Sequence, residues 1–192
     1  DLELVTKVLN RKPFIWDNYP VNDYFTCRGI TRLHLGPVKN RASELRNMVS
    51  GYTANPANQV EISKIAIYTI ADMIREGPRY KPDESLSKAI DFLVNKSARY
   101  WFKRFVEFNR ATFMDLNEET ITRENADEVQ EIVKNLRETL SNRKLLKEIE
   151  PVLNKMSSIA RYAKGEQVFL SWRIQTAGES VSYTHLTLPT TE

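Results

Sequence analysis

The 192-residue sequence predicts an α/β segment followed by an all-α segment, and two of its features lead to that expectation. Up to Gly77, short apolar runs alternate with amphipathic helical patterns, which is the order of parallel strands joined by helices. After Gly77 only the helical periodicity continues, as in a small bundle. We therefore expect one domain over residues 1–80 and a second over residues 83–165.

The first elements are a helix and a strand. Four apolar residues at helical spacing mark one face of a helix near the start: Leu2, Val5, Val8 and Leu9. The apolar run from Pro13 to Trp16 is too short for a helix and is followed by a turn-rich segment, so it predicts a buried strand. The polar residues after Trp16 then lie at the carboxyl end of that strand.

A second strand and a longer helix follow. The apolar run from Met48 to Ala54 predicts the strand. Asn55 and Pro56 suit the N-cap and the first turn of a helix that ends at Gly77. Apolar residues cover so much of the surface of that helix that we expect it to pack on two sides.

The remaining pattern predicts three antiparallel helices in a bundle. Asp83 can cap a long first helix that continues into an aromatic cluster over residues 100–108. Residues 126–140 form the second helix and residues 146–163 the third, with a break at Pro151. The aromatic cluster could serve as a carbohydrate platform, but its helical spacing favours the bundle core.

Charge and composition exclude several partners. The 28 basic and 25 acidic residues are interspersed, so no dense basic stripe attracts nucleic acid. No apolar run approaches the roughly 18 residues of a membrane span. The single cysteine, Cys27, and the histidines His34 and His185 offer few ligands for zinc. We interpret Cys27 as a buried thiol and His34, which lies between two leucines, as a structural residue.

The segment after the first strand carries the candidate chemistry. It brings an aromatic ring, amides and carboxylates together in the order Trp16-Asp17-Asn18-Tyr19-Pro20-Val21-Asn22-Asp23. Parallel α/β folds hold functional groups at the carboxyl ends of strands, and these groups suit a sugar pocket. Asp17 and Asp23 are candidates for the acid and base of a glycosidase. They lie six residues apart on a loop that turns at Pro20, so we expect no catalytic pair, and a loop Asp is more often a turn or cap residue.

The same segment resembles the end of the catalytic barrel of glycoside hydrolase family 84, together with two further stretches: Leu33-His34-Leu35-Gly36-Pro37 and Ser50-Gly51-Tyr52-Thr53-Ala54-Asn55-Pro56. The family comprises β-N-acetylglucosaminidases, including protein O-GlcNAcases and enzymes once called hyaluronidases. The resemblance implies that residues 1–80 are the C-terminal part of a (β/α)8 TIM barrel, followed by a helical region. It also implies GlcNAc-containing glycans or glycoproteins as partners, no cofactor or metal, and a secreted or cell-surface location in a bacterium.

Catalysis in this family relies on two consecutive Asp residues of an earlier barrel strand. The acetamido oxygen of the substrate attacks the anomeric carbon and gives an oxazoline. One Asp orients and deprotonates the acetamido nitrogen, and the other acts first as general acid and then as general base. The sequence contains no Asp-Asp dipeptide. The resemblance therefore implies a fragment whose catalytic pair lies upstream of Asp1.

The resemblance also assigns four residues to sugar binding. Trp16 would wall the pocket for the N-acetyl methyl group, because an indole offers a flat apolar surface. Asn18, Asp23 and Asn55 would form hydrogen bonds with the sugar, and the two oxygens of Asp23 could accept from adjacent hydroxyls. Two structural alternatives stay open, in which Trp16 is a core residue of the strand and Asn55 is a helix N-cap.

A rival hypothesis is a non-catalytic module, in which the helical segment from Asp83 to Gly165 binds a carbohydrate or a protein and the barrel remnant only supports it. Residues 181–192 have no helical pattern and resemble translated cloning sequence, so we leave them out of the fold prediction. An authentic β-strand tail is the alternative for that segment.

Overall fold

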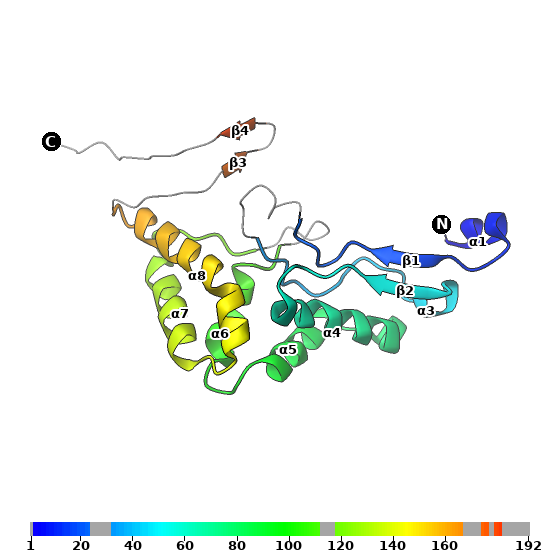
Figure 1. Cartoon of the computed structure of the whole chain (residues 1–192), viewed down its shortest axis with the longest axis horizontal. Helices are drawn as coiled ribbons and strands as arrows, with labels where there is room; N and C mark the ends of the chain where they lie inside the picture. Colours follow the sequence, from blue (N-terminus) through cyan, green and yellow to red (C-terminus); the bar gives the residue numbers. More distant parts are fainter. Residues whose placement is uncertain (1, 24–31, 112–117, 167–173, 177–178, 182–192) are drawn as a thin grey trace.

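A computed structural model describes residues 2–23, 32–111, 118–166, 174–176 and 179–181 (Figure 1). Tyr24, Cys27, His185 and the predicted tail from residue 182 onward lie outside the described residues. The described part is mostly helical and holds two small two-stranded sheets. The parallel sheet lies along one side of a long helix, and a group of further helices lies beyond it (Figure 1).

The two predicted strands form the parallel sheet. Strand β1 spans Phe14–Asp17 and strand β2 spans Gly51–Ala54. Phe14 lies opposite Gly51 and Asp17 lies opposite Ala54. Backbone hydrogen bonds continue at both ends, since Ser50 N–H donates to Pro13 O at 2.8 Å and Asn55 N–H donates to Asp17 O at 2.8 Å. Both carboxyl ends therefore lie at the same edge of the sheet.

The two faces of this sheet have different surroundings. Side chains of successive residues in a strand point to opposite faces. Tyr52 and Ala54 pack against a core that also contains residues of the following helix. Phe14 and Trp16 belong to the other face, where they are 63% and 65% exposed. The ring of Phe14 packs directly on Gly51. A Cβ atom added to Gly51 would lie 2.5 Å from Phe14 Cε2, so the ring can lie there only because residue 51 has no side chain.

Helix α4 spans Val60–Glu76 and packs on two sides, as its apolar pattern predicts. On one side Ile62 and Ile65 join the core of the bundle. On the other side Ala66, Ile70 and Met73 join the core beneath the sheet. The helix ends at Gly77, whose positive φ of 54° favours glycine.

The predicted N-cap role of Asn55 is wrong. Gln59 occupies the N-cap position of α4, and residues 55–59 separate β2 from the helix. The physical reason is that the backbone N–H of Asn55 still extends the ladder to Asp17, so the chain remains extended there. The side chain of Asn55 instead donates to Asn18 Oδ1.

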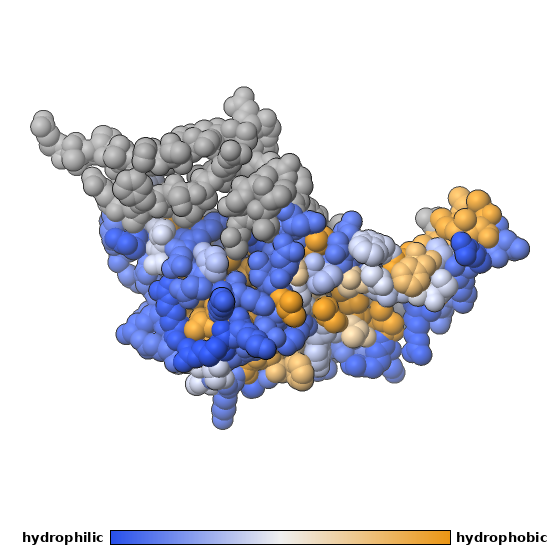
Figure 2. Space-filling view, viewed as in Figure 1, coloured by the Kyte–Doolittle hydropathy of each residue, from blue (hydrophilic) through white to orange (hydrophobic). Residues whose placement is uncertain are grey.

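Helix α1 spans Leu2–Leu9, as predicted, but none of its residues is buried. Leu2 is partly buried against the core beneath the sheet, whereas the other apolar residues of α1 are exposed, and Val8 reaches 76%. The space-filling view shows these hydrophobic atoms gathered at the end of the molecule that carries α1 (Figure 2). Short helix α3, Leu45–Met48, precedes β2 and places Leu45 in the core beneath the sheet.

The described residues of the helical part form four helices where the sequence predicts three. They are α5, Pro82–Leu93; α6, Arg99–Glu107; α7, Ala126–Thr139; and α8, Arg143–Ala163, after a short 3-10 turn η1, Gly77–Arg79. The expected single helix from Asp83 is interrupted between α5 and α6, because the side chain of Asn95 binds the chain where α7 ends and leads into α8. Its Nδ2 donates to Thr139 O at 2.9 Å and its Oδ1 accepts from Ser141 N–H at 3.0 Å.

Two further details of the helix predictions need correction. Asp83 is not the N-cap of α5. Lys81 is the N-cap, Pro82 is the first helical residue, and Asp83 lies inside the first turn. Helix α8 runs through Pro151 without a break. Ile149 and Leu153, on either side of Pro151, have fully buried side chains that hold this turn in the core. The stabilisation from their burial outweighs the loss of the one backbone hydrogen bond that proline cannot donate.

The bundle core is formed by α5, α6, α7 and α8 together with one side of α4. Phe102 and Phe105 are fully buried and their ring centroids are 5.7 Å apart, which confirms the aromatic cluster as core. Tyr100 of the same cluster is exposed. Strands β3, Ile174–Thr176, and β4, Glu179–Val181, form the second sheet, which is antiparallel. No helix among the described residues has the length and apolar character needed to cross a membrane.

A pair of phenylalanine variants tests this packing. Phe102→Ala should lower the free energy of unfolding by about 3–5 kcal/mol, because a fully buried ring leaves a cavity. Phe92→Ala, at a side chain that is 75% exposed, should cost less than about 1 kcal/mol. Urea denaturation followed by circular dichroism measures both values in the 192-residue chain, and equal losses would contradict the described core.

Candidate functional site

Three of the four predicted sugar-binding residues meet at the carboxyl edge of the parallel sheet. Asn18 follows β1 directly and Asn55 follows β2 directly. Because the preceding residues Asp17 and Ala54 are paired, these two asparagines are neighbours. Asn55 Nδ2 donates to Asn18 Oδ1 at 3.1 Å, and Trp16 Nε1 donates to the same oxygen at 2.7 Å.

These two hydrogen bonds fix the orientation of the cluster. Asn18 Oδ1 accepts both hydrogen bonds, so the oxygen side of the Asn18 amide faces Trp16 and Asn55. Trp16 is exposed, so the alternative of a core tryptophan does not describe its place in this structure. Its ring offers a flat apolar surface at the rim of the sheet, next to two amide groups.

Asp23, the fourth predicted residue, is exposed, has helical backbone directly after the loop that follows β1, and is the last described residue before residue 32. Its neighbour Asn22 is only 1% exposed and joins the two loops of the site. Asn22 Nδ2 donates to Gln59 Oε1 at 2.8 Å, and Asn22 Oδ1 accepts from Asn58 N–H at 3.2 Å. A third bond from Asn22 Nδ2 reaches Arg32 O at 2.9 Å. Asn22 therefore holds the loop of Asp23 against the loop of Asn55.

Asp17 differs from its prediction as a turn or cap residue. It is the last residue of β1, and its side chain points to the covered face of the sheet, where it is 9% exposed. Arg41 binds both carboxylate oxygens, with Nε 2.8 Å from Oδ2 and Nη2 2.8 Å from Oδ1. The hydroxyl of Tyr52 also donates to Oδ2. Asp17 thus ties the segment around Arg41 to both strands.

The surroundings of Asp17 keep it ionised. Burial alone would raise the pKa of Asp17, but the hydrogen bonds from Arg41 and Tyr52 and the positive charge of Arg41 outweigh burial and lower it. Burial and the neighbouring carboxylate of Asp17 raise the pKa of the Tyr52 hydroxyl. A carboxylate held in this way is unsuited to donate a proton to a leaving group, in agreement with the expectation that Asp17 and Asp23 are not a catalytic pair.

His34 has the structural role that its apolar neighbours predict. It is buried, and its Nδ1 lies 2.9 Å from Ala111 O. Burial lowers the pKa of His34, which favours the neutral imidazole. The buried hydroxyl of Tyr19 donates to the carbonyl oxygens of His34 and Gly36. These contacts attach the segment after residue 32 to the loop that follows β1.

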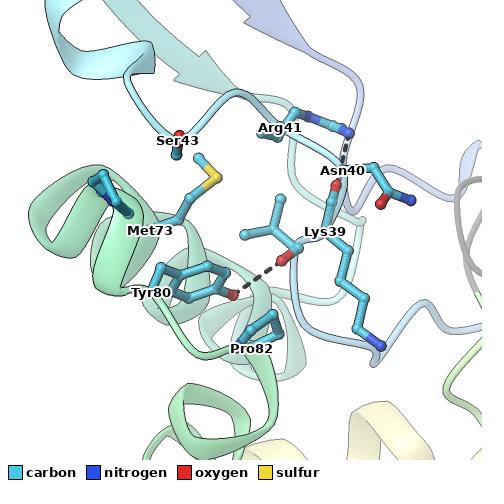
Figure 3. Close-up of a pocket in the computed structure, with 10 residues that line it drawn as sticks. Lys39, Asn40, Arg41, Ser43, Met73, Tyr80 and Pro82 are labelled. Carbon is cyan, nitrogen blue, oxygen red and sulfur yellow. Dashed lines mark hydrogen bonds between the residues drawn. The ribbon is translucent and has the colours of Figure 1, made fainter.

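A hollow of about 320 Å³ lies beside Arg41, between residues 38–43 and the end of α4 (Figure 3). Met73, Tyr80 and Pro82 lie along one side of it (Figure 3). The Tyr80 hydroxyl donates to Val38 O at 3.0 Å, and Arg41 Nη1 donates to Lys39 O at 3.1 Å. The described residues that line it include none of the four predicted sugar-binding residues. The hollow is therefore separate from the predicted sugar-binding residues, and its lining residues help to hold Arg41 in place.

Metal ligands do not gather in the described part of the chain. No group of three His, Cys, Asp or Glu side chains lies close enough there to hold an ion. The groups that meet at the sheet edge are two amides and an indole, which suit neutral hydrogen-bonding ligands with an apolar face.

Comparison with known proteins identifies the family of this chain. The family model described as beta-N-acetylglucosaminidase matches residues 1–107, which is more than half of the chain. The chain therefore belongs to the β-N-acetylglucosaminidase family, glycoside hydrolase family 84. This confirms the resemblance found in the sequence.

Several relatives are similar over part of the chain. The protein O-GlcNAcases of Rattus norvegicus and Mus musculus are each 41% identical over 70 residues, which is 36% of this chain and 7% of each relative. The solved structure of CpGH84B matches with a TM-score of 0.66 and 25% identity, over 85% of this chain and 32% of that one. A mutant of the Thermobaculum terrenum O-GlcNAc hydrolase matches with a TM-score of 0.68 and 27% identity, over 84% of this chain and 39% of that one.

The structural similarity covers more of the chain than the family model does. The structural matches cover 84% and 85% of the chain, more than the segment matched by the family model. The likeness therefore reaches past residue 107 into the helical part. The chain spans only a small share of the curated relatives that it matches and about a third of the solved structures.

The buried ion pair of Asp17 leads to a prediction about stability. Asp17→Asn should lower the free energy of unfolding at pH 7 by about 3 kcal/mol, because the partly buried guanidinium of Arg41 would lose its carboxylate partner. Asp127→Asn is the control, since Asp127 is 83% exposed and should contribute less than about 1 kcal/mol through its pair with Lys164. Urea denaturation of the 192-residue chain measures both.

The same variant should show a particular pH dependence. The pKa of Asp17 is lower in the folded chain than in the unfolded chain, where it is about 3.9. The stability from this pair is therefore present above about pH 4 and is lost as pH falls through the folded pKa. The gap between the unmodified chain and Asp17→Asn should narrow below pH 4. A gap that is constant from pH 7 to pH 3 would contradict the ion pair.

Proposed function

We propose that this chain is the C-terminal part of the (β/α)8 barrel of a retaining β-N-acetylglucosaminidase and supplies its sugar-binding residues. The observation that carries the proposal is the meeting of Trp16, Asn18 and Asn55 at the carboxyl edge of two parallel strands. In barrel enzymes, active sites are built at this edge. We assign residues 1–80 to the barrel and residues 83–165 to the helical bundle.

The asymmetry of the sheet supports the barrel assignment. Each strand of such a barrel has one face toward the outer helices and one face toward the interior. Here Tyr52 and Ala54 face α4, whereas Phe14 and Trp16 are exposed on the opposite face. We infer that the opposite face is the barrel interior. The remaining strands of the parent protein would then cover Phe14 and the exposed residues of α1.

Each of the four residues has a role that fits its chemistry. The exposed ring of Trp16 provides a flat wall for the N-acetyl methyl group of the sugar. Asn18 and Asn55 lie next to it and carry amide groups that bind hydroxyls. Asp23, directly after the loop held by Asn22, is acceptor-only when ionised and suits two adjacent hydroxyls.

The bond-breaking step belongs to the family mechanism of substrate assistance. The acetamido oxygen forms a bond to the anomeric carbon while the glycosidic bond breaks and the general acid protonates the leaving oxygen. Water then opens the oxazoline with overall retention. We place the Asp pair that serves this step outside these 192 residues, since the sequence holds no Asp-Asp dipeptide. This chain binds and orients the sugar for that step.

The substrate class follows from the relatives. We propose terminal GlcNAc of the O-GlcNAc type, carried by glycans or glycoproteins, because the matched proteins are named O-GlcNAcase and O-GlcNAc hydrolase. An indole wall beside two amides suits this sugar, which combines an apolar methyl group with several hydroxyls.

The division of labour can be tested on the chain itself. The 192-residue chain should not hydrolyse an aryl β-N-acetylglucosaminide above the rate in buffer, because it lacks the catalytic pair. The full-length parent protein should hydrolyse the same substrate with release of the β-configured sugar, which proton NMR detects. Turnover by the short chain that Asp23→Ala abolishes would contradict the proposal, and so would an inactive full-length protein.

The role of Asp23 is tested in the full-length parent. Charge-assisted hydrogen bonds contribute about 1.5–3 kcal/mol each. Asp23→Asn should therefore lower kcat/KM by about one to two orders of magnitude. The control Asp127→Asn removes an exposed carboxylate of α7 and should leave kcat/KM unchanged. Equal losses in the two variants, with melting temperatures unchanged, would contradict the assignment of Asp23 to the sugar.

A further inference from the structure

The first turn of α4 is capped by a residue far away in the sequence. The N-cap residue of α4, Gln59, makes no side-chain hydrogen bond to the helix, yet helix starts leave several backbone N–H groups without an intrahelical partner. Glu148, on α8 of the bundle, accepts two of them. Glu61 N–H donates to Glu148 Oε1 at 3.0 Å, and Ile62 N–H donates to Glu148 Oε2 at 3.0 Å.

The chemistry of this contact favours a carboxylate. Both oxygens of Glu148 accept from consecutive backbone amides, and a negative charge at a helix N-terminus interacts favourably with the helix dipole. Glu61, in the same first turn, has its carboxylate engaged elsewhere. Its Oε1 accepts from Lys64 Nζ at 2.7 Å and its Oε2 accepts from Asn142 Nδ2 at 3.1 Å.

The capped turn is joined to the sugar site by a short segment. Residues 55–59 run from the end of β2 to the start of α4. The backbone N–H of Asn55 fixes the first end through Asp17 O, and the N–H of Asn58 is fixed by Asn22 Oδ1. The other end is held at Gln59, whose side chain accepts from Asn22 Nδ2, and by the first turn of α4 that follows. Glu148 holds that turn from the bundle.

We propose that Glu148 is a positioning residue for the sugar site. By capping α4, it fixes segment 55–59 and with it the side chain of Asn55 at the carboxyl edge of the sheet. The inference rests on the proposed function, since it assigns the bundle a part in binding the same sugar. The bundle is then more than a neighbour of the barrel, because one of its carboxylates sets the geometry of a barrel loop.

Kinetics of the full-length parent test this role with three variants. Glu148→Ala removes both acceptors, and Glu148→Gln keeps one oxygen but loses the charge. Glu150→Gln is the matched control, two residues further along α8, where Glu150 pairs with Arg137 of α7 at 2.7 Å. All three are assayed on one aryl β-N-acetylglucosaminide.

The expected change is in KM. Glu148→Ala should raise KM about fivefold, the factor that corresponds to a cap of about 1 kcal/mol, with kcat within about twofold. Glu148→Gln should give a smaller rise, and Glu150→Gln no change. A purely structural loss would instead reduce the fraction of folded enzyme, so kcat would fall while KM stayed the same. That second pattern would overturn the proposal.

Hydrogen exchange of the same variants separates this inference from the proposed function. Peptides that contain residues 55–62 should exchange faster in Glu148→Ala than in the unmodified protein and in Glu150→Gln. Unchanged exchange in Glu148→Ala would overturn the positioning role whatever the kinetics. If the unmodified parent is inactive on GlcNAc glycosides, the proposed function fails and the sugar role of Glu148 fails with it, while faster exchange would still establish the cap.

Discussion

The parallel pairing of β1 with β2 is the constraint on which the candidate site depends. Because Asp17 lies opposite Ala54, the next residues of both strands, Asn18 and Asn55, come into hydrogen-bonding distance. The same register turns Trp16 to the open face and Asp17 to the covered face. A shift by one residue would exchange these faces, burying the indole and exposing the carboxylate that Arg41 binds.

Helix α4 connects this sheet to the rest of the chain. One of its sides packs beneath the sheet and the other joins the bundle core, so the two parts share an element. The Asp17–Arg41 pair fastens the segment before β2, and Asn22 fastens the segment after it. The site residues are therefore held by contacts on the covered side, while the Trp16 ring remains open to a ligand. Membership of the glycoside hydrolase family gives that arrangement its functional context.

Much of the fold could be predicted from local patterns, because strands, helix faces and the stop at Gly77 depend on neighbouring residues. The supports of the site could not. Asn22, Arg41 and Glu148 act on partners up to 87 residues away in the sequence, and no local signal names those partners. The break between α5 and α6 has the same origin, since Asn95 binds the last residue of α7 and Ser141 in the connection to α8.

We propose that the carboxyl edge of β1 and β2 binds the sugar. A crystal structure of the full-length parent with a bound inhibitor derived from N-acetylglucosamine measures this most directly. We expect the N-acetyl methyl group to lie against the Trp16 ring, with Asn18, Asp23 and Asn55 within hydrogen-bonding distance of the sugar. An inhibitor bound elsewhere, with none of these side chains in contact, would contradict it.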